Sequence, residues 1–385
     1  MKNISEKVKS LLKNYLKNNI KFNNLSLLYR IKLTNRSMLY RVFIIGIMIL
    51  SLTLIPACQE NNPDKPYNSS NDKSNKELNK SKTEIVKNIE GYTYNHMNDQ
   101  IEKLQGEYQG LSVSNIGKSH LGKDLPLLEL GKGEKKIMVL GGVHGREGLT
   151  SLLVMKIIEE YLNNYDNRKS TLSSYNLTEL FEQVELSFLP MLNPDGLEIA
   201  VNGISDLDNR DFYIQANEGE KDFSRWKANA RGVDLNKQFS ADWEKVESTT
   251  DPHFESYKGP APESEPESKA LAQLTRKENF DLVICFHHSG RIIYWYYNQK
   301  GKQLERDQRL ARLISQTNNY ELINPEDSDS AAAGYKDWFI KEFSNPGFTI
   351  EIGYKQKVEK PLSANKLDKY LQENIEVILK LAENL

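Results

Sequence analysis

The feature that most limits the fold of this chain is an alternation of short apolar segments with a longer stretch of helical periodicity. Four short segments have the length and composition of buried strands, at 136–140, 184–189, 281–284 and 348–350. The second leads into an Asn-Pro-Asp-Gly sequence that predicts a turn. Residues 152–162, after the first segment, have the periodicity of a helix. Strands separated by helices favour an α/β sheet, so we expect a single α/β domain.

Residues that can bind a metal stand at or just past the ends of three of these segments. His144 and Glu147 form a His-x-x-Glu pair after the first segment and a Gly-Gly turn. His287 follows the third segment, and Glu351 follows the fourth. Ligands of open α/β sheets bind beyond the carboxyl ends of the strands, so these side chains are expected to converge. Two His and one Glu form a zinc site with an open position for water. We therefore predict one Zn²⁺ per chain on His144, Glu147 and His287.

The local sequences around these residues resemble the M14 family of zinc metallocarboxypeptidases. The resemblance rests on Gly-Gly-Val-His-Gly-Arg-Glu at 141–147 and on Pro-Gly-Phe-Thr-Ile-Glu-Ile-Gly at 346–353, and it extends from about Thr93 to Leu385. It implies an enzyme, a zinc peptidase whose central mixed, twisted β-sheet is flanked by helices. It also implies that Glu351 is a general base, which takes a proton from zinc-activated water and passes it to the departing amine.

Two adjacent histidines compete for the third ligand position. Neighbouring side chains of an extended segment point to opposite sides, so both cannot easily bind one metal. Bacterial relatives in the family have a His followed three residues later by Gly and then by Tyr-Trp. His287, Gly290, Tyr294 and Trp295 fit that frame. This interpretation leaves His288 as a residue of the cleft wall or as a donor that supports a ligand.

The resemblance further implies a set of substrate-binding residues, namely Arg146, Lys227, Asn236 and Lys237. Lys227 corresponds to the oxyanion-stabilising Arg of the family, with Arg231 as the alternative. Lys237 stands where relatives have the Arg that grips a terminal carboxylate, and an ammonium cannot make the planar two-point contact of a guanidinium. Solvated surface positions remain the alternative for both lysines. The family's mobile Tyr is absent at its usual spacing, and Tyr335 is the one candidate substitute.

Within the family, the motifs resemble those of the bacterial branch that contains γ-D-glutamyl-L-diamino acid endopeptidases, which trim peptidoglycan stem peptides. The expected function is therefore hydrolysis of the γ-D-Glu–diamino acid bond. One alternative is a general metallocarboxypeptidase that removes C-terminal residues from external peptides, and another is a non-catalytic lipoprotein that binds wall peptides. With 51 basic and 53 acidic residues, the chain has no bulk charge that would favour nucleic acid as a partner.

The N-terminal part predicts export and membrane attachment. We divide the chain into a basic extension at 1–37, a signal peptide at 38–57, a disordered polar tether at 58–83 and the catalytic domain at 84–385. Translation from Met38 would leave a short, ordinary basic flank before the apolar run. The tether has too few apolar residues to offset its ordering entropy.

Cys58 is the predicted lipidation site. Ile-Pro-Ala-Cys at 55–58 resembles the lipobox of bacterial lipoproteins, although Pro56 is unusual there. The expected location is the outer face of the bacterial cytoplasmic membrane, with a lipid anchor. The alternatives are a secreted protein and an uncleaved N-terminal anchor. The only other cysteine, Cys285, lies in an apolar run and is expected to be a buried core residue.

Overall fold

The computed structural model describes residues 84–166, 172, 174–325, 332–355 and 360–385. The chain divides into two units, Met1–Lys80 and Ser81–Leu385, and the described residues belong to the second. The predicted leader, tether and Cys58 lie outside the described residues, so these assignments stay predictions. Within the described part of the chain, no helix combines the length and apolarity that a membrane span requires.

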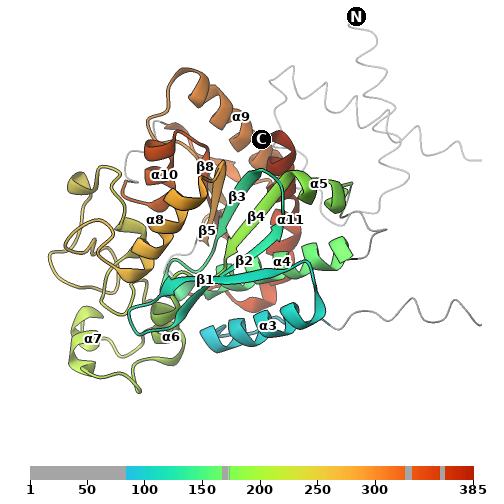
Figure 1. Cartoon of the computed structure of the whole chain (residues 1–385). Helices are drawn as coiled ribbons and strands as arrows, with labels where there is room; N and C mark the ends of the chain where they lie inside the picture. Colours follow the sequence, from blue (N-terminus) through green and yellow to red (C-terminus); the bar gives the residue numbers. More distant parts are fainter. Residues whose placement is uncertain (1–83, 167–171, 173, 326–331, 356–359) are drawn as a thin grey trace, which may run out of the picture. The chain divides into compact units, whose positions relative to one another are not determined.

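The centre of the catalytic unit is one mixed, twisted sheet of eight strands (Figure 1). Its spatial order is β1 (Ser112–Lys118), β2 (Asp124–Gly131), β4 (Val184–Leu189), β3 (Lys135–Leu140), β5 (Leu282–His288), β8 (Gly347–Ile352), β6 (Ile292–Tyr294) and β7 (Glu321–Leu322). Strands β4, β3, β5 and β8 run parallel to one another in the middle. The pairs β1–β2, β2–β4 and β6–β8 are antiparallel. The predicted α/β class and the mixed sheet are confirmed.

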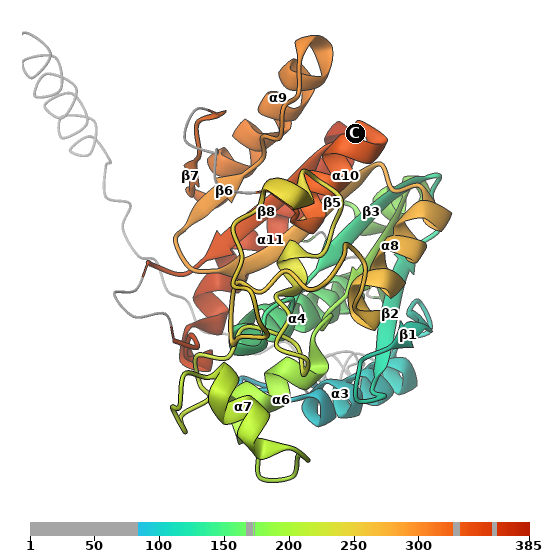
Figure 2. The ribbon, with the colours of Figure 1, turned by 90° about the vertical axis from the view of Figure 1, so that its left-hand side faces the viewer.

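Helices cover both faces of this sheet (Figures 1 and 2). One face packs against α3 (Tyr94–Glu107), α4 (Gly148–Asp166), α5 (Leu177–Gln183), α9 (Gly301–Asn318) and α11 (Leu367–Asn384). The other face packs against α8 (Pro266–Glu278) and α10 (Tyr335–Phe343). A smaller apolar cluster joins α6 (Pro194–Asn202) and α7 (Arg210–Ala216) to the loop that follows them. Short 3-10 turns occur at η1 (Gly145–Glu147), η2 (Leu235–Lys237), η3 (Trp243–Lys245) and η5 (Ala364–Lys366).

Strand β3 shows why the central strands have continuous apolar runs in their sequences. Ile137 and Val139 belong to the core on the α4 face, whereas Met138 and Leu140 belong to the core on the α8 face. Because side chains alternate along a strand and both faces are covered, the four buried positions 137–140 are all apolar. Cys285 on β5 is buried in the same way, and burial raises the pKa of its thiol.

One local prediction was wrong. The Asn-Pro-Asp-Gly sequence at 193–196 does not form a turn but begins helix α6. Asn193 is the N-cap, and its side-chain oxygen accepts a hydrogen bond of 2.9 Å from the Gly196 amide. Pro194 occupies the first helical position, where a missing amide proton costs nothing. The same residue types that favour a turn therefore start a helix here.

Candidate active site

The first two candidate ligands lie on a short turn between β3 and α4. Residues 144–147, called the ligand turn below, consist of His144 as N-cap and the 3-10 turn η1. Gly145 packs directly on the first turn of α6, where an added Cβ would come within 2.3 Å of the Gly196 carbonyl oxygen. Asn193 donates from its amide to the carbonyls of Val143 at 3.2 Å and Ala228 at 3.1 Å. These contacts fix the ligand turn against α6 and the 226–234 segment.

The side chains of His144, Glu147 and His287 meet in one buried cluster. His144 Nδ1 lies 2.7 Å from Glu147 Oε1, and His287 Nδ1 lies 3.2 Å from both His144 Nδ1 and Glu147 Oε2. The three residues are only 1–3 % exposed. Burial alone would raise the pKa of the Glu147 carboxyl, but the two imidazoles outweigh it and hold that pKa well below its ordinary value. The carboxyl is therefore a carboxylate that can bind a cation.

The cluster fits the chemistry of a zinc site. Two ring nitrogens and a carboxylate are donors that zinc prefers, and tetrahedral zinc with bonds of about 2.0–2.1 Å would separate its donor atoms by roughly 3.3 Å. The distances of 2.7–3.2 Å between the donors are close to that separation. His144 also places its other nitrogen, Nε2, 3.2 Å from Asp234 Oδ1. Histidines that bind metals commonly present the second nitrogen to a carboxylate in this way.

Glu351 is placed beside the cluster by strand register. It pairs with His287 across the parallel strands β8 and β5, so the two side chains lie on the same face of the sheet. Burial is the largest influence on the Glu351 carboxyl and raises its pKa, and the nearby Glu147 adds to the rise. A carboxyl group with a raised pKa next to a metal cluster is suited to accept and return a proton.

His288 supports the cluster without joining it. Its backbone amide donates to Glu147 Oε2 at 3.3 Å, and its side-chain Nε2 lies 3.3 Å from the Arg146 carbonyl oxygen. Burial lowers the pKa of this imidazole, which favours the neutral form. The geometry therefore agrees with His287 as the ligand and with His288 as a residue that positions the ligand turn.

Two of the predicted cations stand close to Glu351. Charges on Lys227 and Arg146 both lower the pKa of the Glu351 carboxyl, against the larger effect of burial. Lys227 Nζ lies 3.8 Å from Asp234 Oδ2, and Arg146 Nη1 lies 3.5 Å from Glu255 Oε2. Arg231, the alternative to Lys227, instead points to Glu265, with its Nη1 3.5 Å from the carboxylate. Lys227 is therefore the better placed of the two.

Asn236 and Lys237 lie on η2, directly after Asp234. The backbone amide of Asn236 donates to Asp234 Oδ1 at 3.0 Å. The same carboxylate therefore orders this turn and faces His144. Lys237 Nζ donates to the Glu247 carbonyl at 3.0 Å. Burial lowers the pKa of Lys237, and the charge of Lys227 lowers it further. The lysine thus sits at the site, but in its present position its ammonium is bound to the backbone.

Tyr335 cannot replace the family's mobile Tyr. It lies in the first turn of α10, is 1 % exposed, and its hydroxyl makes a 2.8 Å hydrogen bond with Thr275 Oγ1. Its ring packs against Phe239 and Trp338 in the core on the α8 and α10 face of the sheet. Helix formation at this segment, rather than a loop, directs the side chain away from the cleft.

Asp234 is the functional residue that the sequence interpretation missed. Its carboxylate is 1 % exposed, and it contacts His144, Lys227 and two backbone amides. Burial favours the neutral acid, yet Lys227 and His144 outweigh it and hold the Asp234 pKa well below its ordinary value. Asp234 could have been found from the Gly-Val-Asp sequence at 232–234. An aspartate inside a motif that is otherwise rich in binding residues is itself a candidate for a role in the site.

The fold and the site together define a metal-dependent hydrolase of the α/β class. The sequence model of the M14 family, described as zinc carboxypeptidase, matches residues 97–377, and the chain belongs to this family. The chain is 36 % identical over 301 residues to γ-D-glutamyl-L-diamino acid endopeptidase 1 of Lysinibacillus sphaericus, covering 77 % of this chain and 73 % of the relative. It is 27 % identical to carboxypeptidase B of Astacus astacus over 54 % of this chain and 63 % of the relative.

Solved structures agree on the fold. The crystal structure of thrombin-activatable fibrinolysis inhibitor superposes with a TM-score of 0.61 at 21 % identity, covering 76 % of each chain. A carboxypeptidase A from Helicoverpa armigera gives a TM-score of 0.59 at 19 % identity, over 79 % of this chain and 76 % of the other. The predicted family and enzyme class are confirmed by the family model and the Lysinibacillus relative, and the zinc cofactor by the family model together with the His/Glu/His cluster.

Proposed function

We propose that this zinc peptidase cleaves the bond between γ-D-Glu and a diamino acid in peptidoglycan stem peptides. The observation that carries the proposal is the 36 % identity to an endopeptidase named for that bond, which extends over 77 % of the chain. Membership of the family alone would leave the substrate open, because one fold hosts many specificities. The match also covers 73 % of the relative, so it is not confined to one short motif.

In the proposed mechanism Glu351 is the general base. His144, Glu147 and His287 would hold the zinc, which when bound acidifies water and polarises the substrate carbonyl. Glu351 takes a proton from the attacking water and later delivers it to the departing amine. Lys227, close to Glu351, stabilises negative charge that develops on the carbonyl oxygen. Asp234 holds both Lys227 and His144 in place.

The position of Lys237 favours a substrate other than a simple N-blocked dipeptide. Its ammonium donates to a backbone carbonyl, and it cannot replace the guanidinium fork that binds a terminal carboxylate at two points. The second candidate function is a general carboxypeptidase, favoured by the positive charge that Lys237 still provides beside Asn236. The two functions differ in the bond that is cut, so product analysis separates them.

We also propose that the enzyme is exported and anchored through a lipid on Cys58. Two acyl chains would give stable attachment, and the polar tether at 58–83 would let the catalytic unit reach the cell wall. Cys58→Ser should abolish lipid labelling and cleavage before residue 58. Unchanged processing and detergent partitioning of this variant would favour a plain signal peptide or an uncleaved anchor.

The test of the substrate uses synthetic peptides that contain one γ-D-Glu–diamino acid bond, with matched N-blocked dipeptides as the comparison. Mass spectrometry of the products identifies the bond. We expect the γ-linked peptide to be cleaved at that bond and the dipeptides to be cleaved weakly. A wide preference for the dipeptides would replace the wall-peptide function with that of a general carboxypeptidase.

A further inference from the structure

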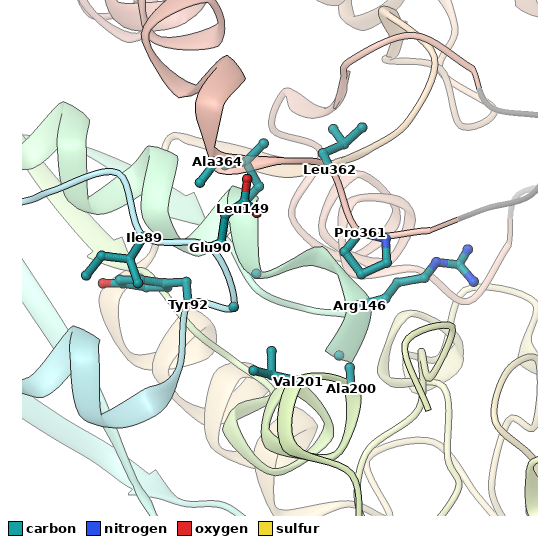
Figure 3. A pocket seen from close by; sticks show the side chains of 13 residues that line it. Ile89, Glu90, Tyr92, Arg146, Leu149, Ala200, Val201, Pro361, Leu362 and Ala364 are labelled. Atoms are coloured by element: carbon teal, nitrogen blue, oxygen red, sulfur yellow. The ribbon is translucent and has the colours of Figure 1, made fainter. Parts of the chain in front are cut away.

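A cavity with a volume of about 410 Å³ lies beside the first turn of α7, the helix labelled in Figure 2. The 226–234 segment, the 252–260 segment and His120 complete its lining. Ligand pockets of proteins usually have volumes of about 300–1,000 Å³, so this cavity can hold a small molecule. The crevice beside Arg146 (Figure 3) has only about 50 Å³. None of the described residues that line the larger cavity is a candidate zinc ligand or Glu351.

Hydrogen bonds fix the wall of the cavity that carries Arg231. The side-chain oxygen of Asn229 accepts from the backbone amides of Arg231 at 2.9 Å and Val233 at 3.1 Å. Asp234, the next residue, donates its backbone amide to the Tyr257 carbonyl at 2.7 Å, which joins the 226–234 segment to the 252–260 segment. Because these bonds hold both segments, the cavity is already formed before a ligand enters it.

The guanidinium of Arg231 has most of its donors available to a ligand. The Arg231 side chain is 45 % exposed, and its Nη1 lies 3.5 Å from Glu265 Oε1, which is farther than in a well-formed hydrogen bond. Glu265 is buried and already accepts a hydrogen bond of 2.8 Å from the Asn229 side chain. Within the described part of the chain, Glu265 is the one ion-pair partner of Arg231. A guanidinium presents five N–H donors in a planar fork that matches a carboxylate at two points.

A second part of the lining carries the opposite charge. Asp208 and Asn209 line the cavity immediately before α7, and both are exposed. Asn209 is the N-cap residue of α7, yet its side chain makes no capping hydrogen bond, although asparagine is a preferred cap. Among the residues that the structure describes, neither side chain forms a hydrogen bond or an ion pair. The Asp208 carboxylate and the Asn209 amide oxygen are therefore available as acceptors.

We propose that this cavity binds a small zwitterion, namely an amino acid or a short peptide that carries a carboxylate and at least one ammonium group. Arg231 binds the carboxylate at two points, and Asp208 accepts from the ammonium group. Phe212 and Val233, which also line the cavity, would contact the carbon chain of the ligand. This second site lies outside the zinc cluster, and it goes beyond the proposed function, which concerns the bond that is cut.

The pair of opposite charges disfavours simpler ligands. An anion such as inorganic phosphate would gain the contact with Arg231 but would face the negative charge of Asp208. A diamine would gain the contact with Asp208 but would face the positive charge of Arg231 in the same cavity. Specific binding depends on attraction to the right ligand and on repulsion of the wrong one. A diamino acid satisfies both charges, so L-lysine is a suitable probe.

The first test titrates the zinc-loaded protein with three related ligands in a calorimeter. L-Lysine carries both kinds of charge, cadaverine is the diamine that remains without the carboxylate, and hexanoate has the carboxylate without the ammonium groups. We expect lysine to bind about tenfold more tightly than either analogue, because each analogue gives up a hydrogen bond to a charged group. Equal binding of the three ligands, or no saturable binding of lysine up to about 10 mM, would refute the proposal.

Paired variants assign the two contacts to their residues. Arg231→Gln should weaken the binding of lysine about tenfold but not that of cadaverine, whereas Asp208→Asn should weaken the binding of lysine but not that of hexanoate. The matched controls are Arg210→Gln and Asp206→Asn, which remove exposed charges that do not line the cavity. Equal lysine binding in all four variants would place the ligand elsewhere, including at the zinc cluster, and would overturn the proposal. The titration records binding and not cleavage, so its result is independent of whether a γ-linked peptide is cut.

Discussion

Replacing Asp234 with Asn should weaken zinc binding although Asp234 is not a ligand. The carboxylate faces His144 Nε2 at 3.2 Å and Lys227 Nζ at 3.8 Å, with 1 % of the residue exposed. An amide keeps the shape but removes the negative charge. Its single oxygen can accept from only one of the two backbone amides, because Asn236 donates to Oδ1 and Ser256 donates to Oδ2. His144 then loses the partner that fixes its orientation and increases its basicity.

The expected loss follows from the position of Asp234 behind a ligand. Changes of such partners typically weaken metal affinity 10–100-fold, which corresponds to roughly 1.4–2.8 kcal/mol. Competition with a chromophoric chelator at neutral pH measures the zinc affinity directly. Circular dichroism and thermal unfolding of the same sample report whether the fold is intact.

Asp195→Asn is the matched control. Asp195 is also fully buried and paired with a lysine, since Lys123 Nζ lies 2.9 Å away, but it contacts none of the three candidate ligands. We expect this variant to lower thermal stability while its zinc affinity changes by less than about twofold. If Asp234→Asn binds zinc as tightly as the unmodified protein, the proposed support of His144 is refuted. Equal weakening in both variants would trace the effect to general destabilisation.

The remaining predictions concern the metal, the base, pH and the substrate. His287→Ala should lose most bound zinc by elemental analysis and His288→Ala should retain it; the reverse would exchange their roles. Glu351→Gln should keep zinc yet lose about 10²–10⁴-fold in kcat, because it removes the base but no ligand. Burial raises the pKa of Glu267 from 4.5 to about 7, so the folded state holds this proton more tightly than the unfolded state. The free energy of unfolding should therefore fall by up to about 3 kcal/mol as pH rises from 4.5 to 7. Glu267→Gln should remove this part of the pH dependence in calorimetry. The same pH dependence in the variant and in the unmodified protein would contradict this assignment to Glu267. Lys237→Arg should improve cleavage of N-blocked dipeptides more than that of γ-linked peptides, and equal gains in kcat/KM would count against its position at a terminal carboxylate.

The candidate site residues could be predicted from sequence because each lies at or just past the carboxyl end of a strand. An apolar run ending in glycine or a polar residue marks the carboxyl end of a buried strand, and parallel strands bring such ends to one edge. His144, His287 and Glu351 therefore meet in the structure although more than 200 residues separate the first from the last. The choice of His287 over His288 has another basis, the resemblance of Gly290, Tyr294 and Trp295 to the family's motif, because the end of a strand does not distinguish two adjacent residues.

The contacts that support the ligands could not be predicted in this way. Asn193 joins Val143 to Ala228, and no pattern within one segment indicates which distant carbonyls an amide will reach. The segment around Glu90 is held by a hydrogen bond from Ser363, which lies near the other end of the domain's sequence. Tyr335 was misplaced because an aromatic residue near a helix start can face either the cleft or the core, and packing against Phe239 decides it.

We propose that this zinc peptidase cuts a γ-D-Glu–diamino acid bond with Glu351 as its base. The most direct measurement incubates the zinc-loaded protein with a peptide that contains this single γ-linked bond and identifies the products by mass spectrometry. Glu351→Gln with full zinc content is run alongside. We predict two products separated at the γ-linked bond for the unmodified protein and intact peptide for the variant. An intact γ-linked peptide with the unmodified protein, or undiminished cleavage by Glu351→Gln, would contradict this account.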